Sequence, residues 1–197
     1  MTLSDEQIAE LEAVRAKLEV RMVEKPRRYQ HSLGVAKTAY EIARAYDVDC
    51  FSAALAGLLH DWDKVLDDHE LLVRAAQYGV RVAGSPSAAV GLLHGPVASY
   101  ELPHIFEGID ASVCQAVARH TVGAVDMTPL DMVVFVADAI EPGRHGDYAE
   151  RLRAMAGESA LEELFFQTFA QGLVYVISGG RYLYPVSYTH LTLPTKA

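Results

Sequence analysis

The sequence predicts a single all-α domain. Apolar residues recur at helical spacing along most of the chain, and short turns that contain Gly or Pro separate the candidate helices. No repeat, low-complexity segment or linker interrupts this pattern. The chain has 197 residues, of which 51% are hydrophobic and 22% charged, so it can bury a core and does not have a disordered composition.

Four helices are expected in the first half of the chain. The first opens at a capping box, Ser4-Asp5-Glu6-Gln7, and runs to about Glu24, where Pro26 breaks the pattern. The next three follow from apolar stripes at helical spacing and cover 29–46, 52–60 and 67–79.

The second half continues in the same way, with one ambiguous segment. After the turn "AGSPS", helices are expected over 88–102, bent near Gly95-Pro96, and over 111–120 and 160–177. The run "MVVFVADA" also suits a buried strand. However, Thr128 and Pro129 before it provide an N-cap and a proline at the first helical position, with Asp131 in the first turn, so we predict a helix.

Composition narrows the class of protein. No apolar run approaches the roughly 18 residues that span a bilayer, and the acidic N-terminus is no signal peptide. The two cysteines, Cys50 and Cys114, are far apart, which is typical of free thiols in a cytoplasmic protein. A net charge of −9 argues against non-specific binding to nucleic acid. A polyanionic ligand would therefore need local cations or bound metal.

Side chains of metal-ligand type end several apolar helical patterns. They are His31, His60 with Asp61, His94, His120 and Asp138. A single such histidine is more often a hydrogen-bonded core residue than a ligand. Burying four imidazoles and two carboxylates, however, costs several kcal/mol each unless they are paired or bound to metal. Together they favour a metal site.

The order H…HD…H…H…D resembles the HD-domain phosphohydrolase superfamily. The phrases "RYQHSLGVA", "AALAGLLHDWDK", "LLHGPVASY", "ARHTVG" and "VADAIEPGR" are similar to the YqeK family of bacterial HD proteins, and the likeness covers about 9–185. The resemblance implies an HD-domain helical bundle with a dinuclear metal site in its core. It also implies a symmetrical bis(5'-nucleosyl)-tetraphosphatase, which cleaves diadenosine tetraphosphate to two ADP.

The resemblance further implies a division of ligands between two metal ions. Asp61 would bridge them, because a carboxylate has two oxygens. One ion would be held by His31, His60, Asp61 and Asp138, and the other by Asp61, His94 and His120. The family favours iron, while the imidazole and carboxylate donors also suit manganese, cobalt or zinc.

The phosphates need cations near the metals. Lys64 follows His60 by one helical turn, and Arg144 follows the turn after Asp138, so both are expected to act in catalysis with Asp61. The expected substrate contacts are Arg28, Lys64, His120, Thr121, Arg144, Gly180, Arg181 and Tyr182. The remaining histidines are expected at the surface, His104 in a loop, together with His69 and His145.

Two other functions stay open. Another HD-domain nucleotide phosphohydrolase, such as a nucleotidase, would have the same ligand set. A metal-dependent nucleotide-binding or sensor module would bind without hydrolysis. The partners expected are a dinucleoside polyphosphate and ADP, with neither nucleic acid nor membrane, and a homodimer is left open.

The C-terminal residues 186–197, "VSYTHLTLPTKA", have no helical period. They resemble translated sequencing-adapter sequence, so the HD domain is expected over 1–185 with an unstructured, non-native tail. His190 then carries no functional weight. Any substrate contact that the family supplies after Pro185 would be missing.

Overall fold

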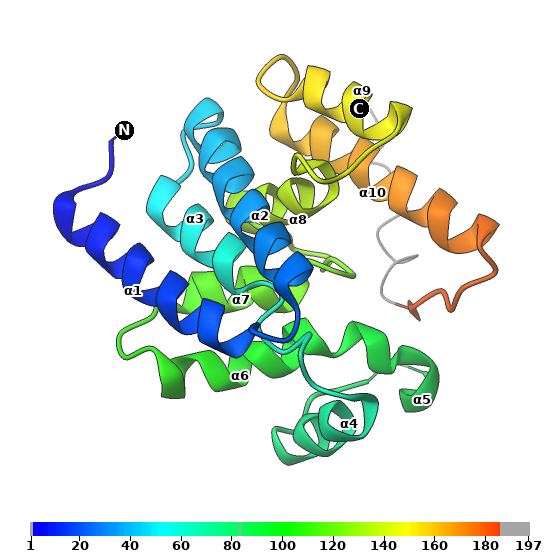
Figure 1. Ribbon diagram of the computed structural model, residues 1–197. Coiled ribbons are helices and arrows are strands. Elements are labelled where there is room, and N and C mark those ends of the chain that lie inside the picture. Colours follow the sequence, from blue (N-terminus) through cyan, green and yellow to red (C-terminus); the bar gives the residue numbers. More distant parts are fainter. Residues whose placement is uncertain (1, 83, 186–197) are drawn as a thin grey trace.

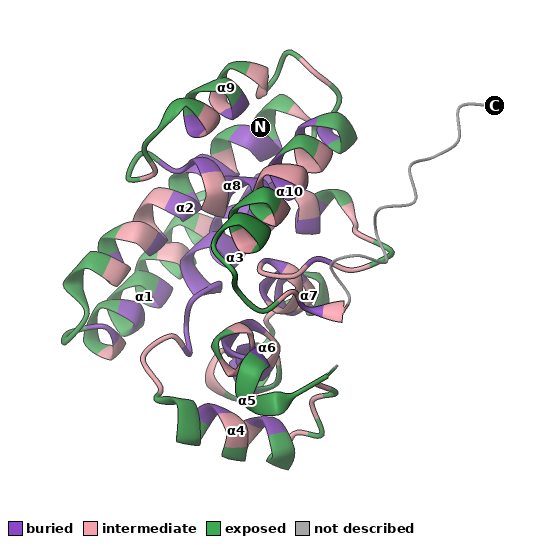
Figure 2. Cartoon of the chain, turned by 90° about the vertical axis from the view of Figure 1, so that its right-hand side faces the viewer, coloured by how far each residue is buried: buried purple, intermediate pink, exposed green. Residues whose placement is uncertain are grey.

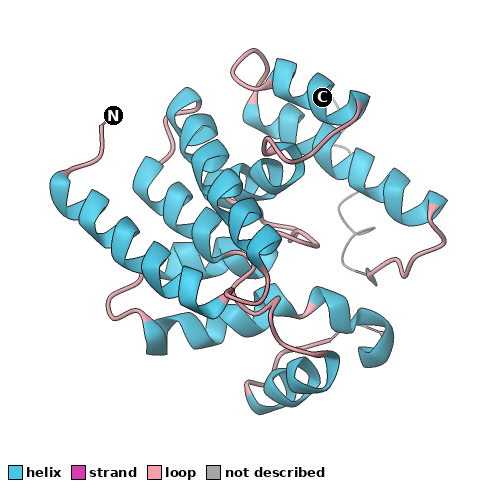
Figure 3. Ribbon diagram, viewed as in Figure 1, coloured by secondary structure: helices cyan, strands magenta, loops and turns pink. Residues whose placement is uncertain are grey.

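The computed structural model describes residues 2–82 and 84–185. All regular structure in these two ranges is helical, which confirms the predicted all-α class (Figure 1, Figure 3). The tail expected over 186–197, including His190, lies outside the described residues. No helix within the described ranges is long and apolar enough to cross a bilayer.

The helices follow one another with short connections. In chain order they are α1 (Asp5–Arg21), α2 (Pro26–Ala45), α3 (Cys50–Leu59), α4 (Asp68–Gln77), α5 (Pro86–Ala89), the 3₁₀ turn η1 (Val90–Leu92), α6 (His94–Ile105), α7 (Ala111–Arg119), α8 (Pro129–Ile140), α9 (Asp147–Met155) and α10 (Leu161–Ser178).

Helix α3 runs through the centre of the bundle. All of its residues except Phe51 and Ser52 are buried, and α1, α2, α7 and α8 surround it. Gly57 allows α2 to approach closely, because a Cβ at this position would lie 2.7 Å from the Cα of Ala36. The sequence "AALAGLLHD" is therefore a buried helix that delivers His60 and Asp61 into the core.

The ambiguous run 132–139 is helical, as predicted. Thr128 Oγ1 accepts from the backbone N–H of Asp131 at 3.3 Å, and the Asp131 carboxylate accepts from the N–H of Thr128 at 2.9 Å. Arg119 and Gln115 also donate to Asp131, so this buried carboxylate is neutralised. Valines 133, 134 and 136 then pack into the core.

Peripheral helices lie at the two ends of the bundle. A second apolar cluster (Leu71, Ala75, Leu93 and Val97) packs α4 against α6. At the opposite end, α9 and α10 pack on α8, and the outer faces of these helices are exposed (Figure 2). Cys50 and Cys114 are free and buried, as expected.

Some expectations need correction. Helix α1 ends at Arg21 rather than Glu24, and Pro26 opens α2 as its first residue instead of only ending α1. The helix expected over 88–102 is divided into α5, η1 and α6, with the break just before His94 rather than at Gly95-Pro96. His104 is exposed, as expected, but belongs to α6. Helix α9 was not predicted.

Candidate metal centre

The predicted metal ligands come from five helices and meet in the core. His60 and Asp61 follow the last residue of α3, and both are buried. The others are His31 within α2, His94 at the start of α6, His120 directly after α7 and Asp138 in the last turn of α8. Helix ends therefore supply most of the ligands, which explains why each stands beside an apolar run in the sequence.

Asp61 lies in the middle of the cluster, and its two oxygens face different histidines. Its Oδ2 lies 3.4 Å from Nε2 of His60 and 3.8 Å from Nε2 of His31. Its Oδ1 lies 3.1 Å from Nε2 of His94 and 3.9 Å from Nε2 of His120. The carboxylate thus divides the imidazoles into two pairs. We call the His31, His60 and Asp61 side the first site and the Asp61, His94 and His120 side the second site.

Distances within each pair fit a bound metal ion. The two Nε2 atoms of His31 and His60 are 3.2 Å apart, and those of His94 and His120 are 3.1 Å apart. Two nitrogens bound about 2.1 Å from one ion have this separation when they subtend an angle of about 95°. Both sites therefore have the size and the donor chemistry for a metal ion.

The Nδ1 atoms explain how the four rings are held. Each faces an acceptor: His60 the carbonyl of Gly57 at 2.7 Å, His120 that of Val117 at 2.7 Å, His94 that of Gly91 at 3.1 Å, and His31 the Glu141 carboxylate at 3.1 Å. A carbonyl only accepts, so a ring proton is assigned to Nδ1, and in the neutral ring the Nε2 lone pair points to the centre. Nε2 lone pairs that face one another and the Asp61 carboxylate repel unless a cation lies between them.

The neutral state of the histidines favours metal binding at the second site. Burial and the neighbouring rings of His94 and His60 lower the pKa of His120 to about 3. Burial also lowers the pKa of His94. Burial acts to lower the pKa of His60 as well, but Asp61 outweighs it and raises this pKa. His120 and His94 are therefore neutral near pH 7, which is the form that binds metal.

Asp138 lies at the open side of the first site. Its Oδ1 lies 3.0 Å from Nε2 of His31 and accepts from Nη2 of Arg144 at 2.7 Å. Its side chain is 26% exposed, against 4% for Asp61. Arg28 donates from Nη1 to Oδ2 of Asp61 at 2.6 Å. Two guanidinium groups therefore border the cluster on the side from which an anion can approach.

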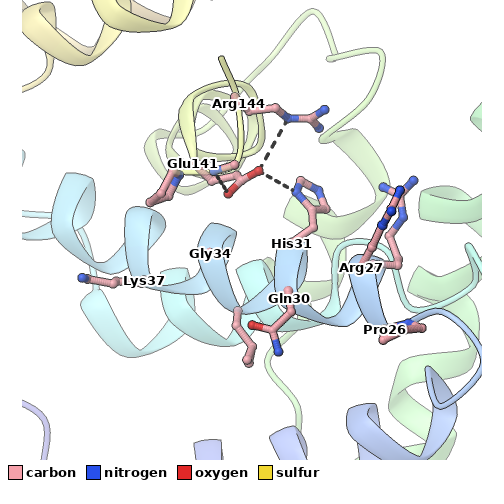
Figure 4. Close-up of a pocket in the computed structure, with 12 residues that line it drawn as sticks. Pro26, Arg27, Gln30, His31, Gly34, Lys37, Glu141 and Arg144 are labelled. Carbon is pink, nitrogen blue, oxygen red and sulfur yellow. Dashed lines mark hydrogen bonds and ion pairs between the residues drawn. The ribbon is translucent and has the colours of Figure 1, made fainter.

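A basic groove and an aromatic pocket meet at Arg144. The basic groove has a volume of about 820 Å³, and its lining includes Arg27, Arg28, His31, Lys37 and Arg144 (Figure 4). The aromatic pocket has a volume of about 540 Å³, and its lining includes His120, Thr121, Phe135, Asp138, Arg144, Tyr148 and Tyr175. Each reaches a predicted metal ligand.

Two predicted polar contacts lie beside the second site. Lys64 follows α3 in a turn instead of extending the helix, and its Nζ donates to the carbonyl of Gly91 at 3.1 Å, next to Nδ1 of His94. Thr121 Oγ1 lies 2.9 Å from Nε2 of His120. Both side chains therefore lie at the cluster. Lys64 contacts the Gly91 carbonyl that faces Nδ1 of His94, and not the metal-facing Nε2.

The predicted C-terminal contacts lie farther from the cluster. Gly180, Arg181 and Tyr182 follow α10, and the guanidinium of Arg181 stacks 4.3 Å from the ring centroid of Tyr175. Because Tyr175 lines the aromatic pocket, Arg181 is one side chain away from it. The hydroxyl of Tyr182 lies against Gly84.

Sequence reasoning missed Glu141. Glu141 is the C-cap residue of α8, and its buried carboxylate contacts His31, which is 110 residues away in sequence. The rule that marked His60 and Asp61, a polar residue directly after an apolar helix, also applies to Glu141 in "VVFVADAIE".

Comparison with known proteins assigns this geometry to a class. A family model described as the HD domain matches residues 28–143, and the chain belongs to this family. A solved structure described as a predicted HD superfamily hydrolase involved in NAD metabolism, from Clostridium acetobutylicum, has the same fold. The TM-score is 0.81 at 30% identity, covering 90% of this chain and 92% of the other.

Two curated relatives narrow the class. The symmetrical bis(5'-nucleosyl)-tetraphosphatase of Staphylococcus aureus is 34% identical over 154 residues, which cover 77% of this chain and 78% of that protein. A protein of the same name from Halalkalibacterium halodurans is 31% identical over 176 residues, 86% and 91% of the two chains. The predicted membership of the YqeK family of symmetrical bis(5'-nucleosyl)-tetraphosphatases is therefore confirmed.

Proposed function

We propose that this protein hydrolyses diadenosine tetraphosphate symmetrically to two ADP, with two metal ions held by the first and second sites. The observation that carries this function is the division of four histidines into two pairs by the two oxygens of Asp61. The relatives named for this reaction support the choice of substrate.

The metal ions, when bound, supply Lewis acidity and an activated water near neutral pH. The chain's own cations handle the phosphates. Arg144 borders both the basic groove and the aromatic pocket, so its planar guanidinium can bind two phosphate oxygens beside Asp138. Arg28 contributes a second charge next to Asp61. As negative charge develops on the phosphoryl oxygens, these fixed cations stabilise it.

The two recesses suit different parts of a dinucleoside tetraphosphate. The basic groove gathers Arg27, Arg28, Lys37 and Arg144, which match a run of phosphates. The aromatic pocket offers Phe135, Tyr148 and Tyr175 for a base and ribose. A substrate that spans both places an inner part of its phosphate chain beside Arg144 and the metal ligands. Cleavage between the second and third phosphates would leave two phosphates on each nucleoside.

Product analysis tests this function. Purified protein loaded with iron, and in parallel with manganese, is incubated with diadenosine tetraphosphate, and the nucleotides are resolved by chromatography. We expect ADP as the nucleotide product. ATP together with AMP would overturn symmetrical cleavage. Faster hydrolysis of mononucleotides would identify a nucleotidase, and binding without turnover would identify a sensor module.

Three finer points belong to the same proposal. Iron is the expected metal, because imidazole and carboxylate donors suit it and the family favours it. A cytoplasmic location agrees with the free thiols of Cys50 and Cys114. A homodimer is the oligomeric form to look for, and light scattering of the metal-loaded protein measures it.

A further inference from the structure

Glu141 places a side-chain carboxylate at Nδ1 of a ligand histidine, whereas Nδ1 of each other ligand histidine faces a backbone carbonyl. Three ligand histidines (His60, His94 and His120) place Nδ1 next to the backbone carbonyl three residues earlier, because each stands at a helix end where such carbonyls are accessible. His31 instead lies inside α2, where the carbonyls of the preceding turn accept helical N–H groups. It therefore needs an acceptor from another helix.

The Glu141 carboxylate fills this need. Its Oε1 lies 3.1 Å from Nδ1 of His31, and its Oε2 accepts from the backbone N–H of Gly143 at 2.6 Å. The second contact fixes the turn that leads to Arg144, whose Nε lies 4.0 Å from Oε1 (Figure 4). The carboxylate is thus held from two sides, and its position determines that of the His31 ring.

The glycine at position 34 leaves space that the Glu141 carboxylate occupies. Gly34 follows His31 by one turn on the same face of α2, and a Cβ there would lie 2.6 Å from Oε2 of Glu141 (Figure 4). Any side chain at position 34 must displace the carboxylate. Gly34 and Glu141 are therefore matched to each other across the α2–α8 contact.

From these contacts we propose that Glu141 is a positioning residue for the first metal site. This role rests on the proposed two-metal function. Glu141 holds His31 in the Nδ1–H tautomer with Nε2 toward Asp61. It thereby sets the metal affinity of the first site separately from that of the second. A carboxylate that accepts from Nδ1–H also makes the imidazole a stronger metal ligand than a carbonyl acceptor does.

Substitution of Glu141 by Gln tests this role. Gln keeps the shape but has one oxygen, so either His31 or Gly143 must face its NH₂ group instead of an acceptor. In titrations with Mn²⁺ alone, we expect the wild type to bind two ions. We expect Glu141→Gln to bind one ion normally and the other about 10–100-fold more weakly. Electron paramagnetic resonance should then show single-ion Mn²⁺ where the wild type shows a coupled pair.

Two further variants separate positioning from general stability. Glu101→Gln is the matched control, because Glu101 is also a buried carboxylate but pairs with Arg74 away from the cluster. It should bind Mn²⁺ like the wild type. Gly34→Ala alters no polar group yet displaces the Glu141 carboxylate, so it should weaken the same ion as Glu141→Gln and carries the test if that variant does not fold.

A readout without metal completes the experiment. ¹⁵N spectra of the imidazoles in metal-free protein should report a protonated Nδ1 for His31 in the wild type and a mixture of tautomers in Glu141→Gln. The proposal is overturned if both variants bind two Mn²⁺ ions as the wild type does, or if both lose the fold. Normal two-ion binding by a wild type that does not cleave diadenosine tetraphosphate would refute the proposed function and leave the positioning role intact.

Discussion

Asp61 is the residue on which both metal sites depend. One oxygen faces the His31 and His60 pair, the other faces the His94 and His120 pair, and Arg28 neutralises the charge from outside. Burial acts to raise the pKa of Asp61, but the charge and hydrogen bond of His60 outweigh it and hold the pKa well below its usual value. The carboxylate is therefore ionised and able to bind two cations at once.

Asp61→Ala should lose both metal ions together with activity, because the variant removes a ligand from each site. His94→Ala should lose mainly the ion of the second site, since the first site keeps all its donors. Metal analysis after gel filtration, with circular dichroism to confirm folding, measures both variants. Two ions per chain in folded Asp61→Ala would show that the carboxylate does not bridge.

Arg144 and Lys64 differ in what they contact. Arg144 lines both recesses, whereas Lys64 donates to the carbonyl that also holds His94. Arg144→Ala should therefore keep both ions and lose turnover by about 10²–10³-fold, as the loss of a transition-state donor does. Lys64→Ala should lose less turnover. Single-turnover rates at saturating substrate test the difference, and equal losses would place Lys64 on the phosphates as well.

Asp63 gives the core a dependence on pH. Burial and the charge of Glu101 raise its pKa to about 6, against the opposing effect of Arg21. Between the unfolded pKa near 3.9 and this value, the folded state holds a proton that the unfolded chain has released. The free energy of unfolding should therefore fall as pH rises from about 4 to about 6.

Asp63→Asn removes this titration. Urea unfolding across the same pH range should show a smaller fall for the variant than for the wild type. Parallel curves for the two proteins would mean that Asp63 is ionised throughout this range in the folded state.

Among the elements, the contact between α2 and α3 positions the site most directly. These helices carry His31 and the His60-Asp61 pair, and Gly57 is what lets their backbones meet. A Cβ at position 57 would lie 2.7 Å from Cα and 2.9 Å from N of Ala36. Backbone atoms cannot move aside as a flexible side chain can, so the helices would have to separate.

Gly57→Ala should therefore destabilise the fold by about 3 kcal/mol, the upper end of the usual cost of overpacking. Gly172→Ala in α10 is the matched control, because its Cβ would meet nothing within 4 Å. Alanine should instead favour that helix by up to about 1 kcal/mol. Thermal unfolding of the two variants measures the contrast. Similar melting temperatures would show that α2 and α3 can separate at little cost.

Prediction from sequence succeeded where local signals agree and failed where such signals are weak or do not reveal the contact. The capping residues Thr128 and Asp131 identified α8 as a helix although its valines suit a strand. Helix α9 lacks such signals, since Gly146 offers no side-chain cap and only Ala149 and Leu152 are buried. Glu141 follows an apolar helix as His60 and Asp61 do, but only the fold shows that it faces His31.

Across the whole molecule, the charge at the basic groove is opposite in sign to the net charge. The chain carries a net charge of −9, yet the basic groove gathers Arg27, Arg28, Lys37 and Arg144. A tetraphosphate bound there lies within one Debye length of these cations, which is about 10 Å at 0.1 M salt. Salt screens the repulsion from acidic residues that lie farther from the groove than this length.

Local attraction should therefore outweigh overall repulsion in the kinetics. Raising KCl from about 0.05 to 0.5 M should increase KM for diadenosine tetraphosphate at least about threefold and change kcat less, because screening weakens encounter with the groove. Arg27→Ala combined with Lys37→Ala should flatten this dependence while sparing Arg144 beside the metal ligands. If KM instead falls as salt rises, repulsion from the whole molecule governs binding, and the phosphates do not lie along the basic groove.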